Sequence, residues 1–144
     1  VWHGAVQHFS PAQRYDLIVS IPPFFVKSLR PREKKRTQAR HTQNLSFDDL
    51  LTSVIRLIAP EGRFAAILPE PEGRAFLNGA SAVGLYPIRK TTFRSRKHKP
   101  IERLLMEFSL HEQPIDDTEI ILYEQADEWT AEYKVLTKDF YLKV

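Results

Sequence analysis

The hydrophobic positions of the chain form short apolar runs and one clearly helical stretch. Residues 15–20 (YDLIVS) and 63–68 (RFAAIL) are apolar runs without polar alternation, which is typical of strands covered on both faces. Between them, apolar residues recur at helical spacing and predict one face of an amphipathic helix, made of Phe47, Leu50, Leu51, Val54, Ile55 and Ile58. Strand, helix and strand in this order favour a parallel βαβ arrangement.

Capping and turn residues predict where these elements end. Ser46 is a predicted helix N-cap, and Asp49 three residues later gives an acidic variant of the capping box. Residues 60–62 (PEG) are predicted to end this helix and to turn the chain. A weaker helix is predicted over 72–83, with Gly84 as its C-cap.

The last third of the chain predicts more strands and one more helix. Residues 85–94 and 101–109 are two predicted strands joined by a basic turn, and hence an antiparallel hairpin. Residues 119–123 predict a further strand, and 130–138 a short helix. The complete order predicts an α/β fold with a mostly parallel sheet and an antiparallel hairpin at its edge.

Length and composition favour a single domain outside the membrane. The 144 residues fit one domain, and no apolar run approaches the roughly 20 residues that cross a bilayer. The absence of cysteine excludes disulfides and thiolate metal sites, and it favours a cytoplasmic location. We expect no metal site, because no metal-ligand spacing connects His3, His8, His98 and His111.

The net charge of +3 is unevenly distributed along the chain. The acidic carboxyl-terminal segment, 110–144, has nine Asp/Glu against three Lys/Arg. Basic clusters occur at 27–41, with seven Lys/Arg against one Glu, and at 89–99, with six and no acid. They predict a polyanionic partner such as RNA, with two solvated surface segments as the alternative. The first cluster lies in a predicted basic loop, 26–44, whose length suggests a function of its own.

The glycines are too dispersed for a nucleotide-binding turn. An open parallel sheet binds its ligand outside the carboxyl ends of its strands, and nucleotide-type cofactors there usually need a glycine-rich turn after the first strand. The chain has five glycines, no two of them close enough to form such a turn. We therefore interpret residues 1–144 as a single partial domain that lacks the cofactor-binding half.

Several segments, in order, resemble the class I S-adenosylmethionine-dependent methyltransferases that methylate the exocyclic amine of adenine. These segments are Asp16 to Phe25 (DLIVSIPPFF), Ala39 to Thr42 (ARHT), the capped helix SFDDLL, Pro60 to Pro69 and Lys138 to Lys143. Within that class the chain resembles bacterial enzymes that modify the N6 of the adenine beside the anticodon of valine tRNA. The resemblance implies the carboxyl half of a Rossmann-like sheet, S-adenosylmethionine as cofactor, and tRNA or another RNA as partner.

The resemblance gives a chemical role to residues 21–24. The family has Asn-Pro-Pro-Tyr or Asn-Pro-Pro-Phe here, and the Asn oxygen and first proline carbonyl hold the amine hydrogens, so that the nitrogen lone pair points at the methyl group. By this resemblance Pro22 offers the carbonyl, Pro23 rigidifies the turn, and Phe24 stacks on the extruded base. Ile21 has no acceptor, and losing one such hydrogen bond typically costs about 10²–10³ in rate.

The resemblance also implies a cofactor-binding segment at Ala5 and Val6, together with Ser20. The family has Asp where Ala5 stands, a position expected to bind the adenine amine of the cofactor. With Ile21 and the missing glycine-rich turn, this predicts impaired methyl transfer by this chain. Two alternatives stay open: a non-catalytic RNA- or protein-binding module derived from a methyltransferase, and a plain core strand in which Ile21 and Phe25 pack inward.

Basic residues outside that motif are candidate RNA contacts. Lys34, Lys35 and Arg36 are predicted to meet RNA phosphates. Arg40 and His41 stand where the family has an Arg-His pair, and they are expected to contact a phosphate or base. The alternative is that Arg40 pairs with a local carboxylate such as Asp48, and that His41 assists the helix entry.

The predicted hairpin tip supplies a second candidate RNA contact, made of Arg94, Arg96, Lys97 and Lys99. These residues are expected to clamp the stem of an anticodon arm, or else to form a basic turn that keeps an edge hairpin from aggregating. If half of the sheet is absent, Trp2, Ile18 and Phe25 are expected to be exposed, and a homodimer that covers the sheet edge is a further prediction.

Overall fold

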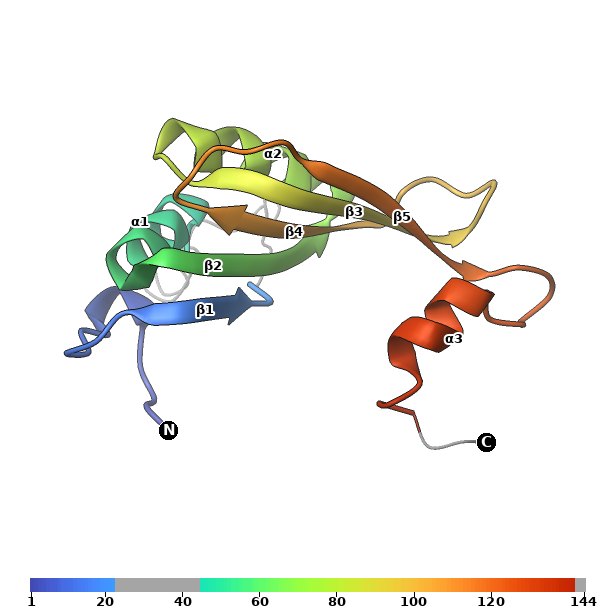
Figure 1. Cartoon of the computed structure of the whole chain (residues 1–144), viewed down its shortest axis with the longest axis horizontal. Coiled ribbons are helices and arrows are strands. Elements are labelled where there is room, and N and C mark those ends of the chain that lie inside the picture. Colours follow the sequence, from blue (N-terminus) through green and yellow to red (C-terminus); the bar gives the residue numbers. More distant parts are fainter. Residues whose placement is uncertain (23–44, 142–144) are drawn as a thin grey trace, which may run out of the picture.

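A single five-stranded sheet organises the structure, which is a computed structural model that describes residues 1–22 and 45–141. Helices α1 and α2 pack on one face of this sheet, and α3 stands apart beyond the end of β5 (Figure 1). The strands are β1 (Tyr15–Ser20), β2 (Ile58–Pro69), β3 (Tyr86–Arg96), β4 (Arg103–Ser109) and β5 (Asp116–Tyr123). The helices are η1 (Val6–His8, a 3-10 turn), α1 (Phe47–Leu57), α2 (Glu70–Ala82) and α3 (Ala131–Thr137).

The strand order is β1-β2-β4-β3-β5, which confirms the α/β class and corrects the expected pairing. β1 pairs parallel with β2 and β3 pairs parallel with β5, whereas β4 is antiparallel to both β2 and β3. The sheet is therefore mixed rather than mostly parallel. The hairpin of β3 and β4 lies inside the sheet, because β5 adds a strand beyond β3.

The capped helix begins as predicted and ends earlier than predicted. The Ser46 hydroxyl accepts a hydrogen bond from the Asp49 backbone N–H at 3.0 Å, and the Asp49 side chain accepts from the Ser46 backbone N–H. The Ser46 hydroxyl also donates to the Asp49 carboxylate at 2.7 Å, and this bond is the main cause of a lowered pKa of the Asp49 carboxyl, followed by the bond from the Ser46 backbone N–H. Ile58 is already extended, with φ −75° and ψ 138°, and it begins β2 instead of completing the helix face.

Residues 60–62 lie inside β2, so the predicted turn is wrong there. They form an irregularity in the pairing, because Ile58 pairs with Tyr15 while Arg63 pairs with Leu17. Gly62 permits the close approach of the two strands: a Cβ there would lie 2.7 Å from the Tyr15 carbonyl oxygen. Residues 60–62 thus interrupt the regular pairing of β2 with β1, but they do not reverse the course of the chain.

The hydrophobic core lies between the sheet and the two helices on its covered face. Phe76 of α2 is fully buried, and its ring centroid lies 5.2 Å from that of Phe47, 6.1 Å from that of Phe64 and 5.7 Å from that of Phe108. α2 ends at Ala82 with Val83 as its C-cap, and Gly84 follows with a φ of +78°, a conformation that favours glycine. This packing fixes β2 and β4 relative to both helices.

Candidate functional site

The carboxyl end of β1 carries the first residues of the predicted adenine-binding motif. β1 ends at Ser20, which pairs with Ala66 of β2, so the carboxyl ends of two parallel strands lie side by side. Ile21 follows with 76% of its side chain exposed, and Pro22 is buried. Ile21 therefore does not pack inward as the core-strand alternative requires. Its side chain faces solvent at the sheet edge where an α/β fold places ligands.

The rest of the motif and the basic loop lie outside the described residues. This applies to Pro23, Phe24 and Phe25, and to the predicted RNA contacts Lys34, Lys35, Arg36, Arg40 and His41. Their roles stay predictions.

The predicted cofactor-binding residues are not gathered in one place. Arg56, near the end of α1, donates hydrogen bonds to the backbone oxygens of Val6 and Phe9, which places this segment beside the end of α1. The Phe9 ring centroid lies 6.3 Å from that of Tyr15, at the start of β1. Ser20 lies at the other end of β1, about 17 Å from Tyr15 at the usual rise per residue. Ala5 and Val6 have no side-chain acceptor. The described residues alone therefore do not fit S-adenosylmethionine.

The second basic cluster, 89–99, is largely neutralised by the acidic carboxyl-terminal segment. β3 and β5 run parallel, and basic side chains of β3 meet acidic side chains of β5 and of the loop that follows it. The ion pairs are Arg89–Asp116, Lys90–Asp117, Arg94–Glu119 and Arg96–Asp127, with N···O distances of 3.3, 2.7, 2.7 and 3.3 Å. These ion pairs stabilise the pairing of β3 with β5. The basic cluster is therefore weaker evidence for RNA binding than the sequence alone suggested.

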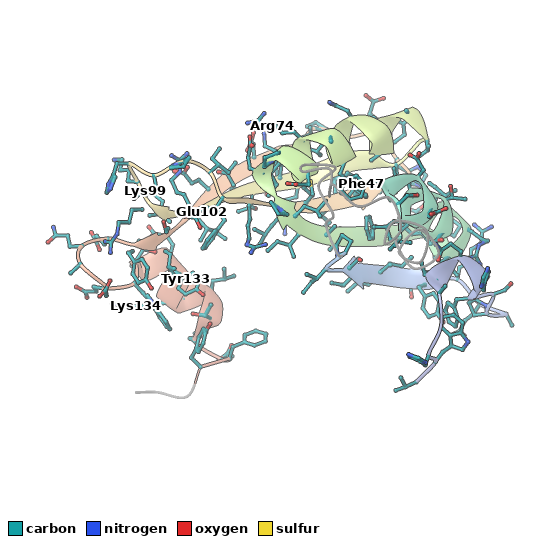
Figure 2. All side chains as sticks on the ribbon, turned by 180° about the vertical axis from the view of Figure 1, so that it is seen from behind. Phe47, Arg74, Lys99, Glu102, Tyr133 and Lys134 are labelled. Atoms are coloured by element: carbon teal, nitrogen blue, oxygen red, sulfur yellow. The ribbon has the colours of Figure 1, made fainter. Side chains whose placement is uncertain are left out.

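The four predicted RNA-contacting residues of the hairpin fall into two pairs. Arg94 also donates to the Lys97 and Lys99 carbonyl oxygens at 3.3 and 3.0 Å, and Arg96 lies over the Tyr123 ring at 5.0 Å from its centroid. Arg94 therefore holds the turn of the hairpin, and Arg96 holds the hairpin to the end of β5. Lys97 and Lys99 are exposed, with no salt bridge in the part of the chain that the structure describes. Figure 2 shows Lys99 at the tip of the hairpin.

Glu102 closes the turn of the hairpin, directly before β4, and introduces a dependence of stability on pH. The Ser95 side chain and the Ser95 backbone N–H, 3.0 Å from Glu102 Oε1, lower the pKa of the Glu102 carboxyl. A carboxyl whose pKa is lower in the folded state stabilises the fold. This contribution is complete above the ordinary glutamate pKa of about 4.3, and it is lost as the pH falls through the lower pKa of the folded state.

Replacing Glu102 with glutamine is therefore expected to flatten the loss of stability on acidification. Urea-unfolding midpoints measured between about pH 6 and pH 3 check this, because that range includes the ordinary glutamate pKa of about 4.3. Glu112→Gln, at an exposed glutamate before β5, is the matched control and should keep the wild-type dependence on pH. Parallel curves for wild type and Glu102→Gln would contradict the assignment.

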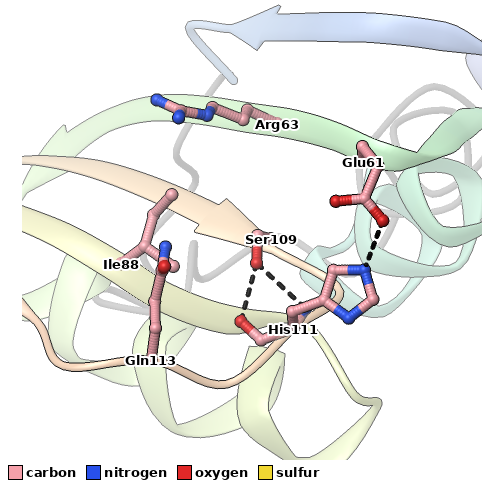
Figure 3. Close-up of a pocket in the computed structure, with 6 residues that line it drawn as sticks. All are labelled: Glu61, Arg63, Ile88, Ser109, His111 and Gln113. Carbon is pink, nitrogen blue, oxygen red and sulfur yellow. Dashed lines mark hydrogen bonds and ion pairs between the residues drawn. The ribbon is translucent and has the colours of Figure 1, made fainter.

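A polar hollow of about 250 Å³ opens where β2 begins and β4 ends, away from the carboxyl ends of β1 and β2 (Figure 3). His111 Nε2 lies 3.0 Å from Glu61 Oε1, within hydrogen-bonding distance, and both side chains are exposed. The Ser109 hydroxyl donates to the His111 carbonyl oxygen at 2.7 Å and accepts from its backbone N–H at 2.9 Å. Because that hydroxyl is bonded to backbone and not to the imidazole, the three side chains do not form a nucleophile–base pair.

Sequence reasoning missed an aromatic cluster on α3. Trp129 packs against Tyr133 and Tyr141, with centroid distances of 5.2 and 5.0 Å. A hydrogen bond with Tyr141 is the main cause of a raised pKa of Tyr133. The spacing of the three aromatic residues was the available signal.

Among the described residues, no group of His, Asp or Glu is arranged to hold a metal ion, and no helix is both long and apolar enough to span a bilayer.

Comparison with known proteins relates this fold to methyltransferases. No protein-family model matches the chain. A predicted O-methyltransferase from Agrobacterium tumefaciens has a similar structure, with TM-score 0.54, 16% identity, and coverage of 64% of this chain and 45% of that one. A putative DNA modification methylase from Thermus thermophilus gives 0.50 and 14%, with coverage of 90% and 55%. At such identities the similarity concerns the fold alone.

Curated relatives are much closer in sequence. The tRNA1(Val) (adenine(37)-N6)-methyltransferase of Trichodesmium erythraeum is 39% identical over 91% of this chain and 55% of its own length. The protein of the same name from Pseudoalteromonas translucida is 33% identical over the whole chain and 62% of its own length. The chain thus spans between half and two thirds of these relatives. By sequence it is therefore similar, over about nine tenths of its length, to relatives that are named tRNA1(Val) (adenine(37)-N6)-methyltransferase.

Proposed function

We propose that this chain supplies the adenine-binding part of an S-adenosylmethionine-dependent tRNA methyltransferase, acting at the N6 of an adenine in the anticodon-loop region. The observation that carries the proposal is the 39% identity over 91% of the chain to a relative with that name. The carboxyl end of the parallel β1–β2 pair supports it, because Ile21 and Pro22 lie where this fold class binds ligands.

In this proposal the chain positions the adenine amine and supplies no general base. The Pro22 carbonyl accepts one amine hydrogen, and the fixed φ of proline orients that carbonyl in advance. S-adenosylmethionine supplies the methyl group. Positioning and charge placement provide most of the acceleration in such a site. Ile21 leaves the second amine hydrogen without a partner, so we propose that transfer is impaired in this chain.

A non-catalytic RNA- or protein-binding module is the second candidate. Two features favour it: the exposed Ile21 side chain has no acceptor, and the described residues do not assemble a cofactor site. In that case the exposed surface of the chain acts in binding alone.

Isothermal titration with S-adenosylmethionine separates the two candidates. The chain is titrated alone and together with the complementing segment, defined as the residues of the Trichodesmium erythraeum relative that this chain does not match. We expect no detectable heat from the chain alone and micromolar binding by the mixture. Absence of binding in both samples, with a complex verified by light scattering, would contradict the methyltransferase proposal.

The hairpin tip gives a prediction about RNA binding. Lys97→Ala and Lys99→Ala are each expected to weaken binding of a tRNA anticodon arm and to reduce the slope of log K against log salt by about 0.7–1. Fluorescence anisotropy across a salt series measures both quantities. Lys138→Ala, an exposed lysine after α3, is the charge-matched control. Equal effects at all three positions would show that the tip has no special role.

A further inference from the structure

β3 carries a row of cations along its length. Residues two apart in a strand share a face, so Lys90, Arg94 and Arg96 lie on one face of the sheet and Arg89 lies on the other. Each of these side chains is paired with a carboxylate of β5 or of the loop that follows it. A line of cations on an extended strand suits the phosphate backbone of a single-stranded nucleic acid. The acidic strand β5 therefore occupies cations that an RNA backbone could also bind.

The segment that pairs with these cations is weakly held. β5 is the outermost strand beyond β3, and α3 stands apart beyond its end (Figure 1). In the described structure none of the residues of β5 or α3 is buried, whereas β2 and β4 contribute Phe64 and Phe108 to the core. The carboxylates of the four ion pairs are between 41% and 92% exposed, and salt screens such pairs. Elements with few buried contacts open at low free energy, so β5 and α3 are expected to open first.

Arg94 is incompletely satisfied while β5 is in place. Its terminal nitrogens lie 2.7 Å from Glu119 and donate to the backbone oxygens of the hairpin turn. Its Nε is buried and has no hydrogen-bond partner among the described residues. A buried donor without a partner is destabilising, so it favours a rearrangement that gives it water or a phosphate oxygen.

We propose that β5 and α3 form an autoinhibitory cover over an RNA-binding surface on β3. While this cover (residues 116–137) is closed, its carboxylates neutralise the cations of β3, and only the exposed lysines of the hairpin tip meet RNA. When the cover opens, Lys90, Arg94 and Arg96 bind backbone phosphates. RNA and the acidic strand thus compete for the same cations, and the apparent affinity falls with the fraction of open molecules. The proposal shares its RNA partner with the proposed function, but it requires neither a cofactor nor methyl transfer.

A disulfide between β3 and β5 tests whether the cover opens. Thr91 and Thr118 are paired in the two strands with their hydroxyl oxygens 2.8 Å apart, and the chain has no cysteine of its own. The double substitution Thr91→Cys/Thr118→Cys therefore gives one polypeptide whose cover is held closed when oxidised and is free when reduced.

Fluorescence anisotropy with a labelled single-stranded RNA across a salt series compares the two forms. We expect the reduced form to bind at least about tenfold more tightly at low salt. Its slope of log K against log salt should be steeper by about 2, as for three further phosphate contacts on a single strand. The wild-type chain, measured with and without the reductant, is the control and should not change.

A second variant tests the masking without a new covalent bond. It replaces the three carboxylates of β5 with amides of the same shape: Asp116→Asn, Asp117→Asn and Glu119→Gln. It should bind the same RNA at least about tenfold more tightly than wild type at low salt. The control makes the same change of net charge at three exposed glutamates of the acidic segment: Glu112→Gln, Glu124→Gln and Glu132→Gln. It should gain clearly less affinity and keep the wild-type salt slope, because its charges lie outside the ion pairs with β3.

Two results would overturn the proposal. Equal affinity and salt slope of the oxidised and reduced forms would show that RNA binding does not depend on opening. Equal gains by the amide variant and its control would show that the carboxylates of β5 cover no binding surface. Neither measurement uses S-adenosylmethionine, so either result leaves the proposed methyl transfer to its own titration. A chain that never binds the cofactor, yet binds RNA only when reduced, contradicts the proposed function and supports this inference.

Discussion

Replacing Ile21 with asparagine is expected to raise the rate of methyl transfer by about 10²–10³, the usual effect of one charge-organising hydrogen bond in a reacting site. The amide oxygen gives the adenine amine its second acceptor, beside the Pro22 carbonyl. The side chain at position 21 is 76% exposed, so asparagine fits there without repacking the core. The rate is measured with labelled S-adenosylmethionine and a tRNA anticodon arm, in the presence of the complementing segment.

Two controls separate the amide from a general effect of polarity. Ile21→Leu keeps the position apolar and should leave the rate at the wild-type level. Ile115→Asn makes the same change at another exposed isoleucine, before β5, and should also have no effect. If the complex forms and binds the cofactor but Ile21→Asn transfers no faster than wild type, the missing amide is not the defect.

The largest expected effect on stability comes from Phe76→Ala, which should lower the free energy of unfolding by about 3–5 kcal/mol. Phe76 is fully buried, and its ring contacts aromatic rings of α1, β2 and β4. Removing it leaves a cavity where the helices meet the sheet. Urea denaturation followed by circular dichroism measures the change.

The matched control is Phe140→Ala, because Phe140 is 88% exposed. Its expected effect lies within about 0.5 kcal/mol, as for most surface substitutions. Phe76→Leu, which keeps most of the volume, should cost clearly less than Phe76→Ala. A loss below about 1 kcal/mol for Phe76→Ala would show that the core does not depend on this ring.

Local sequence patterns were sufficient to predict those elements that form through interactions between neighbouring residues. The strand at 15–20 and the N-cap at Ser46 agree with the structure, since apolar runs and capping bonds depend on neighbouring residues. The place of β4 between β2 and β3 depends on contacts between distant segments, which periodicity does not contain. For the same reason residues 60–62 were predicted as a turn, although pairing with β1 holds them in a strand.

The candidate site was predicted only in part. The sequence motif located Ile21 and Pro22, and the structure places them at the carboxyl end of β1. The charge pattern suggested that Arg94 and Arg96 bind RNA, whereas each is paired with a carboxylate far along the chain. Net charge reports how many charges a segment has, and only the fold decides which of them neutralise one another.

The central claim is that this chain presents an adenine amine for methylation, and mass spectrometry of the tRNA product tests it most directly. The Ile21→Asn chain, complexed with the complementing segment, is incubated with S-adenosylmethionine and tRNA, and the RNA is digested to nucleosides. The account predicts N6-methyladenosine as the product. A complex that binds both cofactor and tRNA but yields no N6-methyladenosine would contradict it.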